Sequence, residues 1–214
     1  MKKGRKETLT IALLAALIVV TAFNTIQIAS LSSTTSGIPL SYESSAVGIA
    51  DTLNIIPRGT PDIYGKELGV SYDDVSAASP QKADETIRKL GLLDVNTELA
   101  GADLQRYVGI TSQLSCEYCC GAESIIFPDG SAACGCAHSY AMRGLAKYLI
   151  TEHGSMTDDA ILEELGKWKT LFFPEQITAK ARVLQSRGIE LNYVNMASNK
   201  YRGITSDGGM VGGC

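Results

Sequence analysis

The chain has 214 residues, and its 23 acidic side chains outnumber its 19 lysines and arginines, so the formal net charge is −4 at pH 7. A protein that binds nucleic acid usually carries a basic surplus, and this chain has none after its N-terminal tip. The sequence also lacks a phosphate-binding loop, a dinucleotide fingerprint and a nucleophile–base motif. These absences exclude the common nucleotide-dependent and hydrolytic enzyme classes.

An uncharged and mostly apolar run over residues 8–31 predicts a membrane anchor. Its length is about the ~20 residues that a helix needs to cross the hydrocarbon core of a bilayer. Four basic residues precede it at positions 2–6, and the next basic residue is Arg58. This asymmetry predicts a single-pass cell-membrane protein with a cytoplasmic N-terminus and an extracytoplasmic domain. A cleaved signal peptide is the alternative, because residues 20–22 fit a small-residue cleavage site.

Composition divides the chain into four expected parts. Residues 1–31 form the cytoplasmic basic tip and the transmembrane signal anchor, and residues 32–60 form a spacer rich in Ser, Thr and Gly. Residues 61–205 form the cysteine-rich extracytoplasmic domain, which is long enough to bury a core of its own. Residues 206–214 form a flexible, glycine-rich tail.

The first predicted elements of the domain are two helices. Ser79 followed by Pro80 is a helix start, and the helix should run to about Leu90 and end at Gly91. A second helix is predicted over residues 102–113. Two short strands, at 124–127 and 131–134, should then form a hairpin around the turn at 128–130.

The second half of the domain is predicted to be mainly helical. Apolar residues recur at helical spacing between Ala137 and Leu149, which leaves Arg143 and Lys147 on the solvent side. Further helices are expected over 157–169 and from Pro174 to Gly188, with a short strand at 190–194. The predicted fold class is therefore α+β and α-rich, with an N-terminal transmembrane helix and one compact domain.

Cysteines are the main functional signal. Five of the six lie between Cys116 and Cys136, and the sixth is the last residue. Two segments carry thiols at short spacing, and a histidine closely follows the second, which is a chelate pattern for a soft or borderline metal ion. The candidate metal ligands are Cys116, Cys119, Cys134, Cys136 and His138, with Cys120 and Cys214 as additional thiols.

The order of knuckle, hairpin and helix is typical of a treble-clef-like zinc finger, so zinc is the predicted cofactor. Zinc takes four ligands, and the surplus of thiols leaves copper(I) as the alternative, since this ion favours soft ligands. The spacings match neither common ferredoxin pattern, which argues against an iron–sulfur cluster. Surplus thiolates also favour closed coordination, and hence a binding, carrier or structural module rather than an enzyme.

Two other interpretations stay open. Six cysteines outside the cytoplasm could form disulfides that staple the domain. Alternatively, Cys116 and Cys119 could act as a thiol–disulfide oxidoreductase pair, although the sequence around them lacks the βαβ pattern of thioredoxin-like proteins. Cys214, with Met210 before it, is either a mobile carrier ligand or a tail thiol that bridges to the domain.

The segment 116–138, with its upstream cysteine pair, Cys134-Gly135-Cys136 and His138, resembles small membrane-anchored cysteine-rich proteins of unknown function. It is similar to the bacterial lipoprotein family named for a Pro-Cys-Tyr-Cys-Gly-Cys signature, the PCYCGC-type family. This chain lacks the Pro-Cys-Tyr prefix and a lipoprotein cysteine. The resemblance implies an extracytoplasmic metal-handling protein, whose partner would be a metal-donor or metal-acceptor protein.

Overall fold

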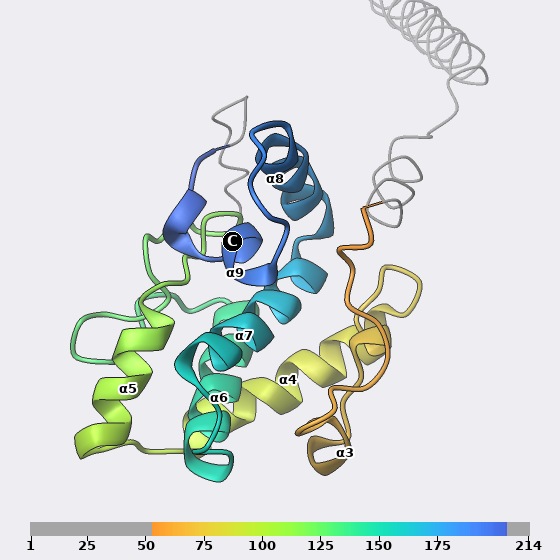
Figure 1. The fold of residues 1–214 in the computed structure, drawn as a ribbon. Helices are drawn as coiled ribbons and strands as arrows, with labels where there is room; N and C mark the ends of the chain where they lie inside the picture. Colours follow the sequence, from red (N-terminus) through yellow and green to blue (C-terminus); the bar gives the residue numbers. More distant parts are fainter. Residues whose placement is uncertain (1–52, 205–214) are drawn as a thin grey trace, which may run out of the picture. The chain divides into compact units, whose positions relative to one another are not determined.

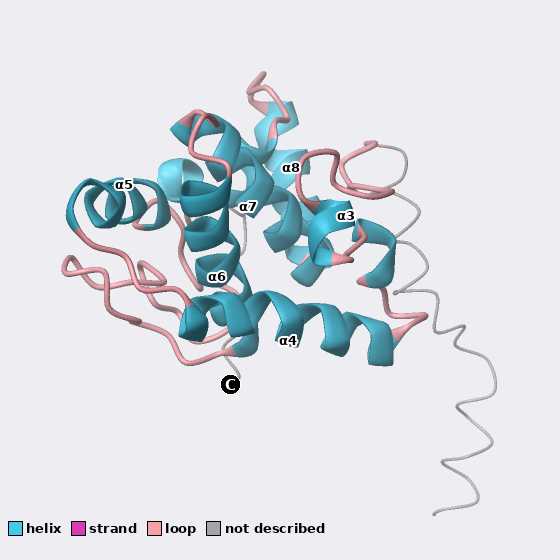
Figure 2. Cartoon of the chain, turned by 90° about the horizontal axis from the view of Figure 1, so that it is seen from below, coloured by secondary structure: helices cyan, strands magenta, loops and turns pink. Residues whose placement is uncertain are grey.

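The computed structural model of this protein describes residues 53–204. Helices joined by loops make up this part of the chain (Figure 1). No β-strand occurs in this range; isolated bridges join Cys116 to Ala122 and Ile126 to Ala132 (Figure 2). The α-rich prediction is confirmed, whereas the predicted strands are not formed. The helices are α3 (Gly65–Leu68), α4 (Pro80–Asn96), α5 (Gly101–Thr111), α6 (Ala137–Glu152), α7 (Asp158–Phe172), α8 (Pro174–Ser186) and α9 (Tyr193–Ala197), with 3-10 turns η2 (Tyr72–Asp74) and η3 (Asn199–Tyr201).

Helices α4 and α6 pack at very short range because glycine lies at their crossing. A Cβ atom on Gly144 of α6 would lie 2.1 Å from the carbonyl oxygen of Leu90 and 2.7 Å from the backbone nitrogen of Asp94, both on α4. Gly91 is buried at the same crossing. The prediction that Gly91 ends its helix is therefore wrong, since this glycine serves close packing and α4 continues to Asn96.

Helix α6 confirms the predicted apolar stripe, with Ala141, Leu145 and Leu149 buried in the core. Its polar face differs from expectation. Arg143 was expected in solvent, but it is 1% exposed and its Nε donates to Asp94 Oδ2 at 2.8 Å. Lys147 pairs with the same carboxylate at 2.8 Å. The partner on α4 comes from a distant part of the sequence, so helical periodicity could not identify it.

The C-terminal helices cover the rest of the core. Helix α7 begins at Asp158 as expected and brings Trp168 into the core, and α8 begins at Pro174. The predicted strand at 190–194 is wrong, because Asn192 caps helix α9 by accepting a hydrogen bond from the backbone of Asn195 at 2.8 Å.

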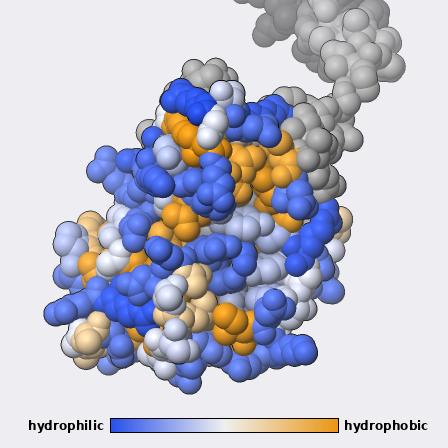
Figure 3. All heavy atoms as spheres, viewed as in Figure 1, coloured by the Kyte–Doolittle hydropathy of each residue, from blue (hydrophilic) through white to orange (hydrophobic). Residues whose placement is uncertain are grey.

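Residues before α4 also contribute to the core, including Ile55, which lies in the segment expected to be a spacer. The face shown in Figure 3 is mainly hydrophilic, with apolar side chains in scattered patches. Among helices of residues 53–204, none combines the length and the apolar character that a membrane crossing needs. The predicted anchor at 8–31 and the tail at 206–214 fall outside the described residues.

Candidate metal centre

The five described cysteines lie in the long connection between α5 and α6, which Figure 2 draws as a loop. Its first half is a tight knuckle in which the carbonyl oxygen of Cys116 accepts hydrogen bonds from the backbone of Cys119 at 3.2 Å and of Gly121 at 3.0 Å. The chain reverses at Gly121, whose φ of 76° favours glycine. Cys116 then pairs with Ala122 through its own N–H at 3.0 Å. This turn brings three cysteines of one short segment, Cys116, Cys119 and Cys120, close together.

A second turn returns the chain to the knuckle. The predicted reversal at 128–130 is present, because Phe127 and Gly130 make the turn bonds, with Phe127 N–H donating to Ser131 at 2.8 Å. Ala133 N–H then donates to the carbonyl of Ile125 at 3.1 Å, which places Cys134 opposite the knuckle. The hairpin thus exists as a loop with an isolated bridge rather than as two strands.

Cys136 is the N-cap of the sixteen-residue helix α6. Its sulfur accepts a hydrogen bond from the backbone of Ser139 at 3.4 Å, and the Ser139 hydroxyl lies 3.2 Å from the same sulfur. The positive end of the helix dipole therefore faces this thiol and favours its thiolate.

The five cysteine sulfurs converge into two overlapping sets of three. In each set all sulfurs lie within 4.8 Å of one another, and Cys116 belongs to both: one set is Cys116, Cys120 and Cys134, and the other is Cys116, Cys119 and Cys136. Two sulfur–sulfur contacts are short, at 3.0 Å between Cys120 and Cys134 and 3.4 Å between Cys116 and Cys136. Cys116 and Cys134 are buried, whereas Cys120 is exposed.

The four cysteines predicted as ligands are thus brought together, and Cys120 joins them. His138 is the exception, because no imidazole nitrogen belongs to either set of described ligand atoms. Its ring packs on Phe172 and Phe173, with centroid distances of 4.8 and 5.0 Å, and it hydrogen-bonds with Cys136. Cys214 lies outside the described residues.

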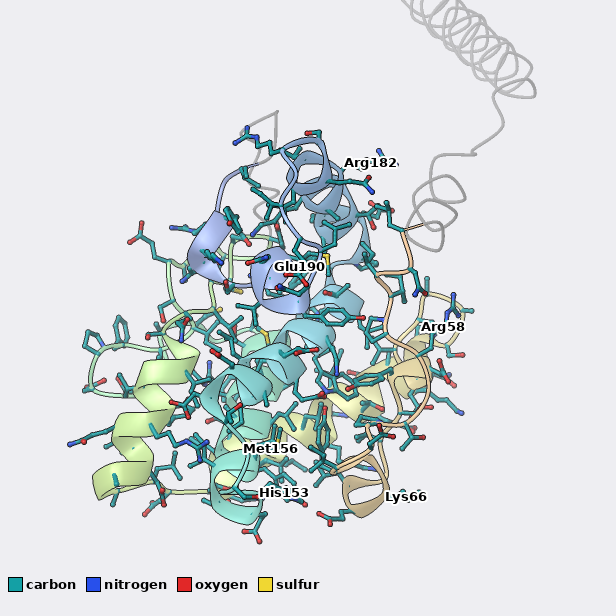
Figure 4. The ribbon with its side chains drawn as sticks, in the orientation of Figure 1. Arg58, Lys66, His153, Met156, Arg182 and Glu190 are labelled. Carbon is teal, nitrogen blue, oxygen red and sulfur yellow. The ribbon has the colours of Figure 1, made fainter. Side chains whose placement is uncertain are left out.

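The second histidine has a separate role. His153 is the C-cap of α6 and pairs with Glu67 at 3.1 Å, in the region labelled at the foot of Figure 4. It contributes no atom to the two thiol sets.

A sulfur–sulfur hydrogen bond of 3.4 Å joins Cys116 and Cys136. The hydrogen bond with Cys116 lowers the pKa of Cys136 to about 2, and His138 and Ser139 add to this effect. The same hydrogen bond, together with burial, raises the pKa of Cys116. The contact therefore favours the thiolate form at Cys136 and the thiol form at Cys116.

The contact between Cys120 and Cys134 has the same form. Burial raises the pKa of Cys134. For Cys120 burial acts in the same sense, but hydrogen bonds from Cys134 and from the backbone of Ala122 outweigh it and lower the pKa. In each pair one cysteine has a lowered pKa and the other a raised pKa, and a metal ion would displace the protons that remain.

Two buried lysines pack against the knuckle, and the sequence did not predict their position there. Lys169 of α7 has no exposed side-chain area, and its Nζ lies 3.1 Å from Glu117 Oε1 and 2.8 Å from the carbonyl of Ala197. Lys180 of α8 reaches the same Glu117 oxygen at 3.7 Å. Glu117 lies between Cys116 and Cys119 in sequence, so two buried cations share one carboxylate next to the thiols. The sequence signal was the glutamate inside the cysteine motif, but its partners lie more than fifty residues away.

Arg143 supports the other half of the loop. Its Nη1 donates to the carbonyl oxygens of Cys134 at 2.8 Å and Ile125 at 3.3 Å, while its Nε holds Asp94. The guanidinium therefore ties the returning cysteine segment to the crossing of α4 and α6.

Comparison with known proteins identifies no relative. No family model matches the chain, and searches of curated proteins and of solved structures return no significant match. The function is therefore argued from the residues of this site.

Proposed function

We propose that residues 116–138 form a thiolate metal centre, and that the protein is a membrane-anchored extracytoplasmic metal-binding protein acting as a carrier. The convergence of five sulfurs from one loop carries the proposal. Thiols gather in this way when they share a soft ion. The order of knuckle, returning loop and helix N-terminus is treble-clef-like, although the returning loop is not a strand-built hairpin.

The sulfur spacing fits an ion better than a complete set of disulfide bonds. Tetrahedral zinc with bonds of about 2.3 Å keeps its sulfurs about 3.8 Å apart, while a disulfide bond is about 2.05 Å long. All sulfurs of a set lie within 4.8 Å of one another, and the contacts of 3.0 and 3.4 Å are longer than a disulfide bond and somewhat shorter than the ligand spacing.

Zinc and copper(I) would use the site differently. Zinc needs four ligands, so the set of Cys116, Cys119 and Cys136 needs one more. We propose His138 for this position, because it hydrogen-bonds with Cys136, although its ring nitrogens lie outside the set in this structure. Copper(I) is satisfied by three thiolates alone. A His138→Ala variant separates the two: it should weaken zinc binding and leave copper(I) binding nearly unchanged.

A carrier role rests on the unequal exposure of the thiols. Cys120 reaches the surface while Cys116 is buried, so a partner thiol can attack the centre from the side of Cys120. The tail thiol Cys214 and Met210 are proposed to assist exchange. Deleting residues 208–214 should then slow metal transfer to an acceptor and leave folding intact. Unchanged transfer rates would exclude that role for the tail.

The membrane anchor at 8–31 remains part of the proposal and rests on the charge asymmetry around it. Protease added to intact cells should cleave the domain and leave the N-terminal tip protected. A mature form starting near Phe23 would instead support a cleaved signal.

A redox role is the second candidate, and the 3.0 Å distance between the sulfurs of Cys120 and Cys134 favours it specifically. Oxidation would join these two, and Cys116 with Cys136, rather than the Cys116–Cys119 pair expected for a thioredoxin-like enzyme. Insulin reduction that is lost in Cys116→Ser would support the oxidoreductase alternative.

The deciding experiment is elemental analysis with thiol titration of the full chain purified without oxygen. The proposal predicts bound zinc or copper, and thiols that react fully only after a chelator is added. Metal-free protein with its cluster thiols bridged would contradict the proposal. Iron with visible absorption would move the assignment to a cluster.

A further inference from the structure

We propose that the centre holds two copper(I) ions that share the thiolate of Cys116. This inference rests on the proposed metal-binding function and specifies the number and kind of ions. The observation behind it is that the sulfurs form two sets of three with one common member, rather than one set of four.

Each set has the composition of a three-coordinate copper(I) site. One ion would lie among Cys116, Cys120 and Cys134, and the second among Cys116, Cys119 and Cys136. Copper(I) prefers soft thiolates and accepts trigonal coordination, so neither ion needs a fourth ligand. A single tetrahedral zinc ion would leave two of the five thiols without a metal partner when His138 is its fourth ligand.

The position of Cys116 suits a bridging ligand. It is the most buried of the set, at 1% exposure, and its sulfur lies 3.4 Å from that of Cys136. The terminal ligands come from both segments of the loop: Cys119 and Cys120 from the knuckle, and Cys134 and Cys136 from the returning segment. Each proposed ion therefore ties the knuckle to the returning segment.

Two buried lysines and one buried glutamate lie beside the proposed anionic cluster. Five thiolates with two monovalent ions carry three negative charges, which a buried site must offset. Lys169 and Lys180 share Glu117 at 3.1 and 3.7 Å, so two amines face one carboxylate behind the knuckle, and burial lowers the pKa of Lys169. Lys169 interacts electrostatically with Cys116, the ligand proposed to bridge both ions.

The two ions would differ in access. Cys120 is exposed, so the ion it binds is open to an incoming thiolate. Cys119 is 9% exposed and Cys136 is partly covered, so the other ion is shielded. We expect a carrier that exchanges the first ion readily and retains the second.

The test is an anaerobic titration of the full, reduced chain with copper(I), in competition with a chromogenic copper(I) chelator. Two ions per chain are expected. Cys119→Ser and Cys120→Ser should each lose one ion, and Cys116→Ser should weaken both by at least about tenfold. Ser131→Ala is the control and should still bind two ions, because Ser131 is an exposed residue of the same loop and offers no sulfur.

The outcomes separate the inference from the function beneath it. One tightly bound ion per chain would overturn the shared-thiolate arrangement and leave the proposed metal-binding function standing. No bound ion would refute both. Loss of an ion in Ser131→Ala would also overturn the inference, since the number of bound ions would then not follow from the thiols alone.

A second measurement covers the case in which Cys116→Ser fails to fold. X-ray absorption at the copper edge of the wild-type protein loaded with two ions should show a three-sulfur shell and a neighbouring copper atom. Two copper ions without a copper–copper shell would contradict the bridge.

Discussion

Replacing Arg143 with methionine should destabilise the domain by about 3 kcal/mol. Arg143 is 1% exposed and makes three hydrogen bonds, to the Asp94 carboxylate and to the carbonyl oxygens of Ile125 and Cys134. Removing one partner of a buried ion pair typically costs about 3–5 kcal/mol. The lower end applies here because Lys147 still pairs with Asp94 at 2.8 Å, while methionine keeps much of the apolar packing.

Urea unfolding of the reduced, metal-free full chain, followed by far-UV circular dichroism, measures this loss. Lys147→Met is the matched control, since Lys147 contacts the same carboxylate but is 17% exposed. We expect a loss of about 1 kcal/mol for the control, and weaker metal binding only in Arg143→Met, which frees the carbonyl of Cys134. Equal losses in the two variants, or less than about 1 kcal/mol for Arg143→Met, would refute the view that the guanidinium anchors the loop.

Three further predictions follow from particular contacts. Gly144→Ala should lower the free energy of unfolding by about 3 kcal/mol or more, because the new Cβ would meet the backbone of α4. The control is Gly109→Ala, which has no neighbour within 4 Å and should be neutral or stabilising in the same urea assay. Equal effects of the two variants would refute the close crossing of α4 and α6. In metal-free reduced protein, Cys120 should be the first thiol alkylated by iodoacetamide, because it is exposed. Burial raises its pKa, but hydrogen bonds from Cys134 and the Ala122 backbone outweigh this and lower the pKa. Peptide mass spectrometry that finds Cys116 modified first would contradict this prediction. Burial lowers the pKa of Lys180 from 10.5 to about 8, so the unfolded state binds more protons between these values and the lysine's contribution to the free energy of unfolding rises with pH there. Lys180→Met should remove that rise, and identical pH slopes for variant and wild type would count against a buried ammonium.

Local signals predicted most of the helices. The apolar stripe of α6, the proline at the start of α4 and α8, and the acidic start of α7 act within a few residues, so they can be read from the sequence. Gly91 was misread because a glycine at a helix end and a glycine at a helix crossing look alike until the second helix is placed.

In the candidate site, too, local features could be predicted and long-range contacts could not. Spacing alone identified the cysteines that converge, because a knuckle and a returning loop are local structures. The buried Lys169, Lys180 and Arg143 were missed, since the carboxylate that pairs with each lies at least forty-nine positions away in sequence. The inclusion of Cys120 depended on the reversal at Gly121, which turns the third thiol of the knuckle toward Cys134.

The central claim is that these thiols hold a metal ion, and X-ray absorption at the edge of the metal present in the protein as isolated tests it most directly. The account predicts a first shell dominated by sulfur, at about 2.3 Å if the ion is zinc, with that shell lost in Cys116→Ser. A shell of oxygen and nitrogen donors alone, or protein that retains no metal while all its thiols are reduced, would contradict it.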